Sequence, residues 1–201
     1  MTVKTKRSRV TKAAGDRRQD IMDAAVRVFS TKGVAGAKVA DITGYAGIAK
    51  GTFYLYFPTK DHVVAALREQ FVEELVQHAQ PFIEQMGQLD WWQLADAVAE
   101  DMVDWTIEHR DICAVIMQTH SMETQDIVAQ ADRQLIQVLA VGIRAGVEAG
   151  AFSTPDPEFA AAFIYNGTIF TVLHEVLYTP SFDRDRLVRV AKAQGRKLLA
   201  P

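Results

Sequence analysis

The segment GIAKGTFYLYFP, residues 47–58, constrains the fold of this 201-residue chain more than any other part. Gly47 suits the left-handed conformation that ends a helix, and a residue that precedes a proline avoids helical backbone angles. Only a short helix therefore fits between Gly47 and Pro58. Phe53 and Phe57 lie four residues apart, on one face of that helix, and can both point into a small core. The segment thus predicts an N-terminal domain built from short helices.

Apolar residues recur at helical spacing along the rest of the chain, and no segment shows the strict alternation of a half-buried strand. Thr59, Asp90 and Asp156 are suitable N-cap residues for three of the longer helices. We therefore expect an all-α protein whose helices cover residues 17–33, 37–47, 49–57, 60–86, 91–109, 111–121, 124–150, 157–178 and 183–200.

Residues 37–57 have the outline of a helix-turn-helix, because two short helices are joined by the glycine-containing turn AGIA. In such a motif the second helix enters the major groove of DNA. Lys50 and Tyr54 share the face opposite the two phenylalanines. They offer an ammonium group for phosphate and a phenol for phosphate or a thymine methyl group. The candidate DNA contacts from this helix and the following turn are Lys50, Gly51, Thr52, Tyr54, Tyr56 and Lys60.

The net charge of −3 hides a strong asymmetry. Residues 1–63 carry 12 Lys and Arg against 5 Asp and Glu, a net +7, whereas residues 64–201 carry 10 against 20, a net −10. A polyanion such as DNA is attracted to the first third and repelled by the remainder. The alternative is a basic tail that only aids solubility.

The stretch VADITGYAGIAKGTFYLYFPTKDHVVAAL, residues 39–67, resembles the helix-turn-helix signature of the TetR/AcrR family of transcriptional repressors. The resemblance is specific over residues 17–68, and beyond them it rests on length and helical pattern. It implies a homodimer that binds a palindromic operator in double-stranded DNA and releases it when a small-molecule effector binds. The matching residues, which fall in order without a gap, are Val39, Asp41, Ile42, Ala46, Gly47, Lys50, Gly51, Thr52, Phe53, Tyr54, Tyr56, Phe57 and Lys60.

Two departures from the family pattern affect the DNA contacts that the resemblance implies. Ala49 stands where the family usually has serine or threonine, so one helix cap and one phosphate contact are missing. Ala37 and Lys38 stand where the family usually has threonines. Lys38 is a candidate to replace the lost phosphate contact through its charge.

The resemblance and the helical pattern together divide the chain into three parts. Residues 1–16 form a basic arm that we expect to be disordered; it could follow the minor groove or contribute little to binding. Residues 17–62 form the helix-turn-helix DNA-binding domain. A long helix links it to a helical ligand-binding and dimerisation domain over residues 63–201.

The second domain is rich in tryptophan and methionine, which are typical of adaptable apolar ligand pockets, although ordinary core is the alternative for each residue. The helix expected over 157–178 is apolar on two faces, so we expect one face against a pocket and the other against a partner subunit. The effector should be bulky and largely apolar or aromatic. The candidate ligand contacts are Trp92, Met102, Trp105, Met117, His120, Phe163, Asn166, Phe170 and His174.

Motifs for catalysis are lacking in the sequence. HEVLY, residues 174–178, has Tyr178 where a zinc protease needs its second histidine, and no nucleophile, phosphate-binding or dinucleotide-binding motif is found. We predict no enzyme activity, metal site or cofactor. The single cysteine, Cys113, excludes an intramolecular disulfide and favours a reducing cytoplasm, with nucleoid association and no membrane contact. The alternative function is a non-specific architectural DNA-binding protein without a ligand, which would not need the acidic second domain.

Overall fold

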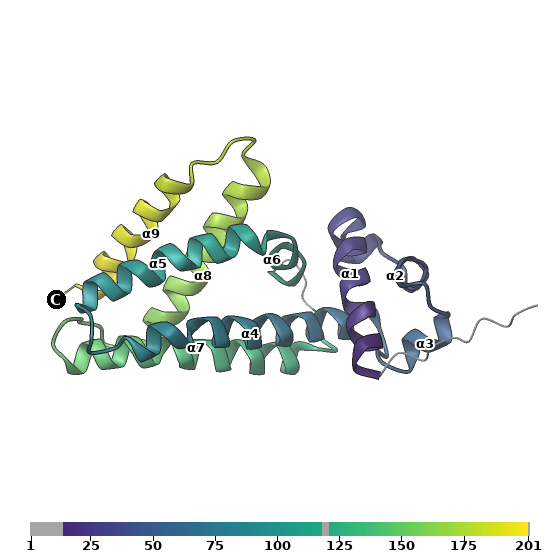
Figure 1. Cartoon of the computed structure of the whole chain (residues 1–201), viewed down its shortest axis with the longest axis horizontal. Helices are drawn as coiled ribbons and strands as arrows, with labels where there is room; N and C mark the ends of the chain where they lie inside the picture. The colour runs from purple at the N-terminus through teal and green to yellow at the C-terminus, as the bar shows by residue number, and fades with distance from the viewer. Residues whose placement is uncertain (1–13, 118–120, 201) are drawn as a thin grey trace, which may run out of the picture. The chain divides into compact units, whose positions relative to one another are not determined.

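The computed structural model describes residues 14–117 and 121–200, and over these residues the protein is helical, without strands (Figure 1). The predicted all-α fold is confirmed. The chain divides into two compact units, residues 1–63 and 64–201. The helices are α1 (Ala14–Gly36), α2 (Val39–Ala46), α3 (Lys50–Tyr54), α4 (Lys60–Glu84), α5 (Trp91–Glu108), α6 (Arg110–Met117), α7 (Gln125–Glu148), α8 (Pro157–Tyr178) and α9 (Arg184–Leu199).

The N-terminal unit packs α1, α2 and α3 around a small apolar core. Ile21, Ala25 and Val28 form an apolar stripe along α1, and all three are buried. Phe53 is fully buried and Phe57 is 3% exposed, with ring centroids 6.0 Å apart. The predicted inward orientation of both phenylalanines is confirmed.

The first helix differs from the expected one at its C-terminal end. Gly33, where we expected the helix to stop, has a φ of 68° and a ψ of 156°, so the chain kinks there and adds a short turn up to Gly36. Glycine tolerates this positive φ because it has no Cβ atom. The Ala37 N–H then donates to the Gly33 carbonyl oxygen at 3.1 Å. This turn leads the chain directly into α2.

The second unit is organised around α8, which packs against α5, α6, α7 and α9. Asp156 caps α8 by accepting from the N–H groups of Glu158 and Phe159, as the sequence predicts. Asp90 caps α5 in the same way. Between α4 and α7, Arg68 Nε donates to Asp132 Oδ1 at 2.7 Å.

A ladder of ion pairs joins α5 to α9. Carboxylates one helical turn apart on α5 each meet a cation on α9: Asp104 with Arg184, Glu100 with Lys192 and Arg184, and Asp96 with Arg196. Hydrogen bonds from Lys192 and Arg184 lower the pKa of Glu100. Because exposed pairs contribute little singly, the ladder mainly fixes the register of the two helices.

The start of α5 is anchored by Phe152, whose ring packs edge-on against Trp91 and Trp92 at centroid distances of 6.0 and 4.8 Å. Phe152 fits there because Gly146 of α7 has no side chain. A Cβ atom on Gly146 would lie 2.1 Å from the Phe152 ring. The approach of this aromatic cluster to α7 therefore requires glycine at that position.

We predict that Gly146→Ala destabilises the second unit by about 1–3 kcal/mol, because the added methyl group overpacks the Phe152 site. Urea unfolding monitored by tryptophan fluorescence measures this effect, since all three tryptophans lie in the second unit. Gly195→Ala is the matched control, because a Cβ atom on Gly195 of α9 meets nothing within 4 Å. Equal stability of the two variants would contradict the prediction.

Candidate DNA-binding and ligand-binding sites

The first candidate site is the exposed side of the α2–turn–α3 motif. Asp41 holds the start of α2 by accepting from the Lys38 N–H at 2.9 Å. Gly47, with a φ of 64°, ends α2 in the left-handed conformation and turns the chain toward α3. Ala49 precedes α3 and provides no side-chain cap. These features place the five-residue α3 after a tight turn, as a helix-turn-helix requires.

The outer side of α3 combines a cation with aromatic and apolar groups. Tyr54 is 49% exposed, and Lys50 Nζ lies 5.9 Å from the centre of its ring. Lys50 and Gly51 are exposed, whereas Thr52 and Tyr56 are half-buried. These groups can contact phosphates and base edges without disturbing the core, because Phe53 alone fixes the buried side of α3.

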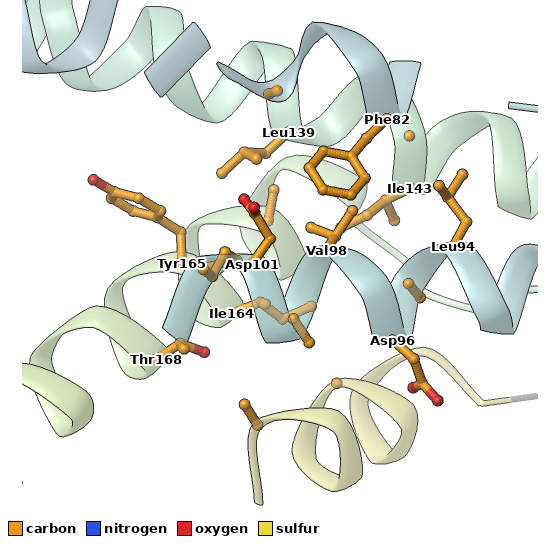
Figure 2. A pocket seen from close by; sticks show the side chains of 18 of the residues that line it. Phe82, Leu94, Asp96, Val98, Asp101, Leu139, Ile143, Ile164, Tyr165 and Thr168 are labelled. Atoms are coloured by element: carbon orange, nitrogen blue, oxygen red, sulfur yellow. The ribbon is translucent and has the colours of Figure 1, made fainter. Parts of the chain in front are cut away.

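The second candidate site is a cavity of about 160 Å³ inside the second unit. Its wall is almost wholly apolar and comes from α4, α5, α7, α8 and α9, together with Phe152 (Figure 2). Lining residues of α5 extend from Trp91 to Trp105, which corresponds to about 20 Å along the helix axis. The cavity is therefore elongated, with Leu94 and Asp96 near one end and Tyr165 near the other (Figure 2).

A few polar groups stand in this apolar wall. His78 Nε2 lies 2.9 and 3.0 Å from the two carboxylate oxygens of Asp101. Trp105 stacks between His109 and His78, with ring centroids 3.9 and 4.3 Å away. Lys192 and Arg196 also line the cavity, but each is paired with a carboxylate of α5.

The face of α8 opposite the cavity is apolar and exposed. Phe159, Phe163 and Phe170 are 68%, 56% and 49% exposed, and they border a shallow hollow that also includes Asn166 and Gly167. Among the described residues, α8 is the helix whose length and mean hydropathy of 1.3 would suit a membrane span, although one such helix is weak evidence. We call this surface, Phe159, Phe163, Asn166, Gly167 and Phe170, the outer face of α8.

Comparisons with known proteins identify the N-terminal unit. The model of the bacterial regulatory proteins of the tetR family matches residues 21–67. The chain is 31% identical over 116 residues to the uncharacterized HTH-type transcriptional regulator YvdT of Bacillus subtilis, an alignment that covers 56% of this chain and 59% of YvdT. It is 26% identical to the HTH-type transcriptional repressor KstR2 of Rhodococcus jostii, over 77% of each chain.

Solved structures share the fold over nearly the whole chain. The transcriptional regulator FadR from Bacillus subtilis, in complex with stearoyl-CoA, superposes with a TM-score of 0.74 at 20% identity, over 90% of this chain and 97% of FadR. A putative TetR-family regulator from Syntrophomonas wolfei gives 0.78 at 17% identity, over 92% and 96% of the two chains. Residues 21–67 thus carry the DNA-binding domain of the tetR family of bacterial regulatory proteins. The second unit shares the fold of these solved structures.

Within the TetR-family motif, one predicted DNA contact has another role in the structure. Lys60 Nζ donates to the carbonyl oxygens of Val34, Ala35 and Ala37, at 2.6, 3.2 and 3.2 Å. An ammonium group has three N–H donors, so all of them are used. In this structure the charge of Lys60 therefore holds the turn after Gly33, and its contact with DNA stays a prediction.

The remaining predicted contacts keep their place on or beside the exposed side of the motif, and Lys38 is exposed at the start of α2. The sequence analysis missed Leu55, which is 82% exposed and four residues after Gly51, and Tyr45 of α2, which is 59% exposed. The Arg27 guanidinium lies 5.8 Å from the centre of the Tyr45 ring. The exposed position of Leu55 could have been predicted from the sequence, because Gly51 and Leu55 are four residues apart and so lie on one side of the helix.

The second unit places the predicted ligand contacts in three different environments. Met102 and Trp105 line the cavity. Trp92 does not line the cavity but packs against Phe152 and Arg196. Its neighbour Trp91 lines the cavity instead. Met117 is buried and accepts from Arg68 Nη1 at 3.0 Å through its sulfur atom. His120 lies outside the described residues.

On α8, the residues that were predicted to contact the ligand lie away from the cavity. Phe163, Asn166 and Phe170 lie on the outer face, and His174 is exposed beside Tyr178. The cavity instead receives residues of the opposite face: Ala161, Ile164, Tyr165, Thr168 and Ile169. Both faces are apolar with helical spacing, so sequence periodicity could not distinguish them.

We predict that Lys60→Met weakens the N-terminal unit by about 1 kcal/mol, because two part-buried carbonyl groups and one exposed carbonyl group lose their donor. Hydrogen–deuterium exchange of the α1–α3 amides in the full chain measures the change locally. Lys50→Met is the matched control and should leave exchange unchanged, because the Lys50 ammonium group has no carbonyl partner among the described residues. Unchanged protection in Lys60→Met would contradict this structural role of Lys60.

Proposed function

We propose that the protein is a dimeric transcriptional repressor that binds a palindromic operator and is released by a small, largely apolar effector. The observation that carries the proposal is the division of α3 into a buried Phe53 side and an exposed side with Lys50 and Tyr54. A dimer that a ligand releases from DNA also needs a ligand cavity and a dimer surface. The second unit has a cavity and an exposed apolar surface on α8. A non-specific architectural DNA-binding protein would need neither.

In the proposed complex, α3 of each subunit enters the major groove. Lys50 pairs with phosphate, and Tyr54 contacts phosphate or a thymine methyl group. Gly51 allows close approach of the backbone, while Thr52 and Tyr56 contact the flanking backbone of the DNA. Lys38, at the start of α2, supplies a further phosphate contact, and Leu55 offers an apolar contact for a thymine methyl group.

The outer face of α8 is the proposed dimer surface. Its three exposed phenylalanines form an apolar patch of the kind that a partner protein covers. A bilayer is a poorer partner for this surface. The opposite side of α8 packs against α5, α6, α7 and α9, and α8 would have to separate from these helices to span a membrane. Dimerisation through this surface would set two α3 helices in successive major grooves, about 34–36 Å apart.

The cavity is the proposed effector site. FadR, which shares the fold, was solved with stearoyl-CoA, and an elongated, mostly apolar cavity suits a ligand with a long apolar part. Its walls include α4, the helix that begins at Lys60 in the N-terminal unit. A ligand that prefers one arrangement of α4 would change the spacing of the two DNA-binding units and so release the operator. We place this activity in the cytoplasm, at the nucleoid.

We predict that Tyr54→Ala abolishes operator binding and that Lys50→Ala lowers the slope of log Kd against log salt by about 1.8, the value expected for two phosphate contacts, one from each subunit. Fluorescence anisotropy with an operator selected from random duplexes measures both. Arg189→Ala is the control, because it removes one exposed cation from α9 of the other unit. If both α3 variants bind normally, the assignment of this face is wrong.

Uniform coating of any duplex by the wild type would favour the architectural alternative.

We predict that Phe163→Glu yields a monomer and weakens operator binding roughly tenfold or more, because a charge would be buried at the centre of the dimer interface. Light scattering coupled to size exclusion measures the mass, and the anisotropy assay measures affinity. Val141→Glu is the matched control, because Val141 is also an exposed apolar residue, 41% accessible, but lies on α7. A dimeric Phe163→Glu variant would exclude the outer face of α8 as the interface.

A further inference from the structure

One carboxylate stands apart in the almost wholly apolar wall of the cavity. Asp101 of α5 lines the cavity and projects toward the side on which Leu139 and Phe82 lie (Figure 2). Asp96, one turn earlier on α5, projects to the opposite side, where it pairs with Arg196 of α9 at 2.8 Å (Figure 2). The Asp101 side chain is 29% exposed, so its oxygens are not sealed within packed protein. It is therefore an accessible charged group in an apolar cavity, where a few polar groups fix a ligand.

Asp101 keeps acceptor capacity beyond the one partner that it has among the described residues. His78 Nε2 lies 2.9 and 3.0 Å from its two carboxylate oxygens. One ring nitrogen supplies at most one proton, whereas an ionised carboxylate has about four lone-pair sites. The His78 ring is itself held by Trp105, at a centroid distance of 4.3 Å. The pair thus presents a positioned carboxylate with sites left for a further donor.

A purely apolar ligand would displace water from this carboxylate. Burial of an ionised carboxylate without compensating partners is costly. The long basic side chains of the wall are already paired, Lys192 with Glu100 and Arg196 with Asp96. A ligand that brings its own positive charge and N–H donors offsets the cost, whereas an anion adds repulsion to it.

We propose that the cavity binds elongated organic cations, with an ammonium group paired to Asp101 and an apolar chain along the rest of the space. This inference rests on the proposed effector function of the cavity and names the chemical class of its ligand. Phe82 and Tyr165 also line the cavity and appear on either side of Asp101 in Figure 2. Aromatic rings attract organic cations, so these neighbours suit an ammonium group. The apolar wall supplies affinity, and Asp101 supplies selectivity for charge.

The test compares three probes with the same ten-carbon chain by isothermal titration calorimetry with the full-length protein at neutral pH. Decylammonium carries one positive charge, 1-decanol is neutral, and decanoate carries one negative charge. We expect decylammonium to bind roughly tenfold more tightly than 1-decanol, because a hydrogen bond between charged groups is stronger than a neutral one, and decanoate to bind most weakly. Binding of 1-decanol as tight as that of decylammonium, tightest binding of decanoate, or no binding of any probe would overturn the proposal.

A pair of variants locates the ammonium group. Asp101→Asn keeps the size of the side chain and removes its charge, so the preference for decylammonium over 1-decanol should fall roughly tenfold. Asp96→Asn is the matched control, because Asp96 lines the same cavity from the same helix but is paired with Arg196. It should keep the wild-type preference. Equal losses in the two variants, or no loss in Asp101→Asn, would overturn the assignment to Asp101.

Two readouts separate the loss of charge from a loss of structure. The affinity for 1-decanol should stay within about twofold in Asp101→Asn, since the apolar wall is unchanged. Asp101→Glu keeps the charge and should retain most of the preference for decylammonium. If Asp101→Glu loses the preference while it still binds 1-decanol, charge at this position is not the cause and the proposal fails.

The operator assay separates this inference from the proposed function. If decylammonium binds with the expected dependence on Asp101 but the operator remains bound, the ligand class stands and the release mechanism fails. If decanoate releases the operator and decylammonium does not, the effector function stands and the proposed ligand class is wrong. Equal release of Asp101→Asn and wild-type protein by decylammonium would show an action on the DNA itself and would count against the cavity as the site.

Discussion

The burial of α8 on one side is the constraint on which the second unit depends. This helix packs against α5, α6, α7 and α9, and its inner residues Ile164, Tyr165 and Ile169 help to enclose the cavity. Its outer face, with Phe159, Phe163 and Phe170, is left exposed. One helix therefore forms both the wall of the proposed effector site and the proposed contact with a second subunit. A ligand that shifts α8 would affect both at once.

The cavity persists because its surroundings are fixed by interactions outside it. The ion pairs of Asp96, Glu100 and Asp104 hold α9 in register along α5. At the end of the cavity near Trp91, Phe152 fills the space that Gly146 leaves. Rigid supports of this kind allow an interior space to remain open where side chains would otherwise collapse into it.

In the DNA-binding unit, the five-residue helix α3 must be held in place by contacts with its neighbours. Phe53 and Phe57 supply its core contacts, and the Lys60 ammonium group satisfies three carbonyl oxygens at the turn after α1. The exposed residues of α3 are then available for recognition because none of them is needed for folding. The missing side-chain cap at Ala49 makes this support more important.

The sequence by itself determined the all-α fold, the helix caps at Asp90 and Asp156, and the inward pair Phe53 and Phe57, because these depend on local periodicity and hydrogen bonding. It also contained the family motif. Only the tertiary structure decided which apolar face of α8 borders the cavity, since both faces have the same spacing.

The role of Lys60 was likewise decided by the tertiary structure, because its carbonyl partners Val34, Ala35 and Ala37 lie more than twenty residues away in the chain. Whether a polar group has a partner depends on which distant helices meet around it, and local sequence does not record that.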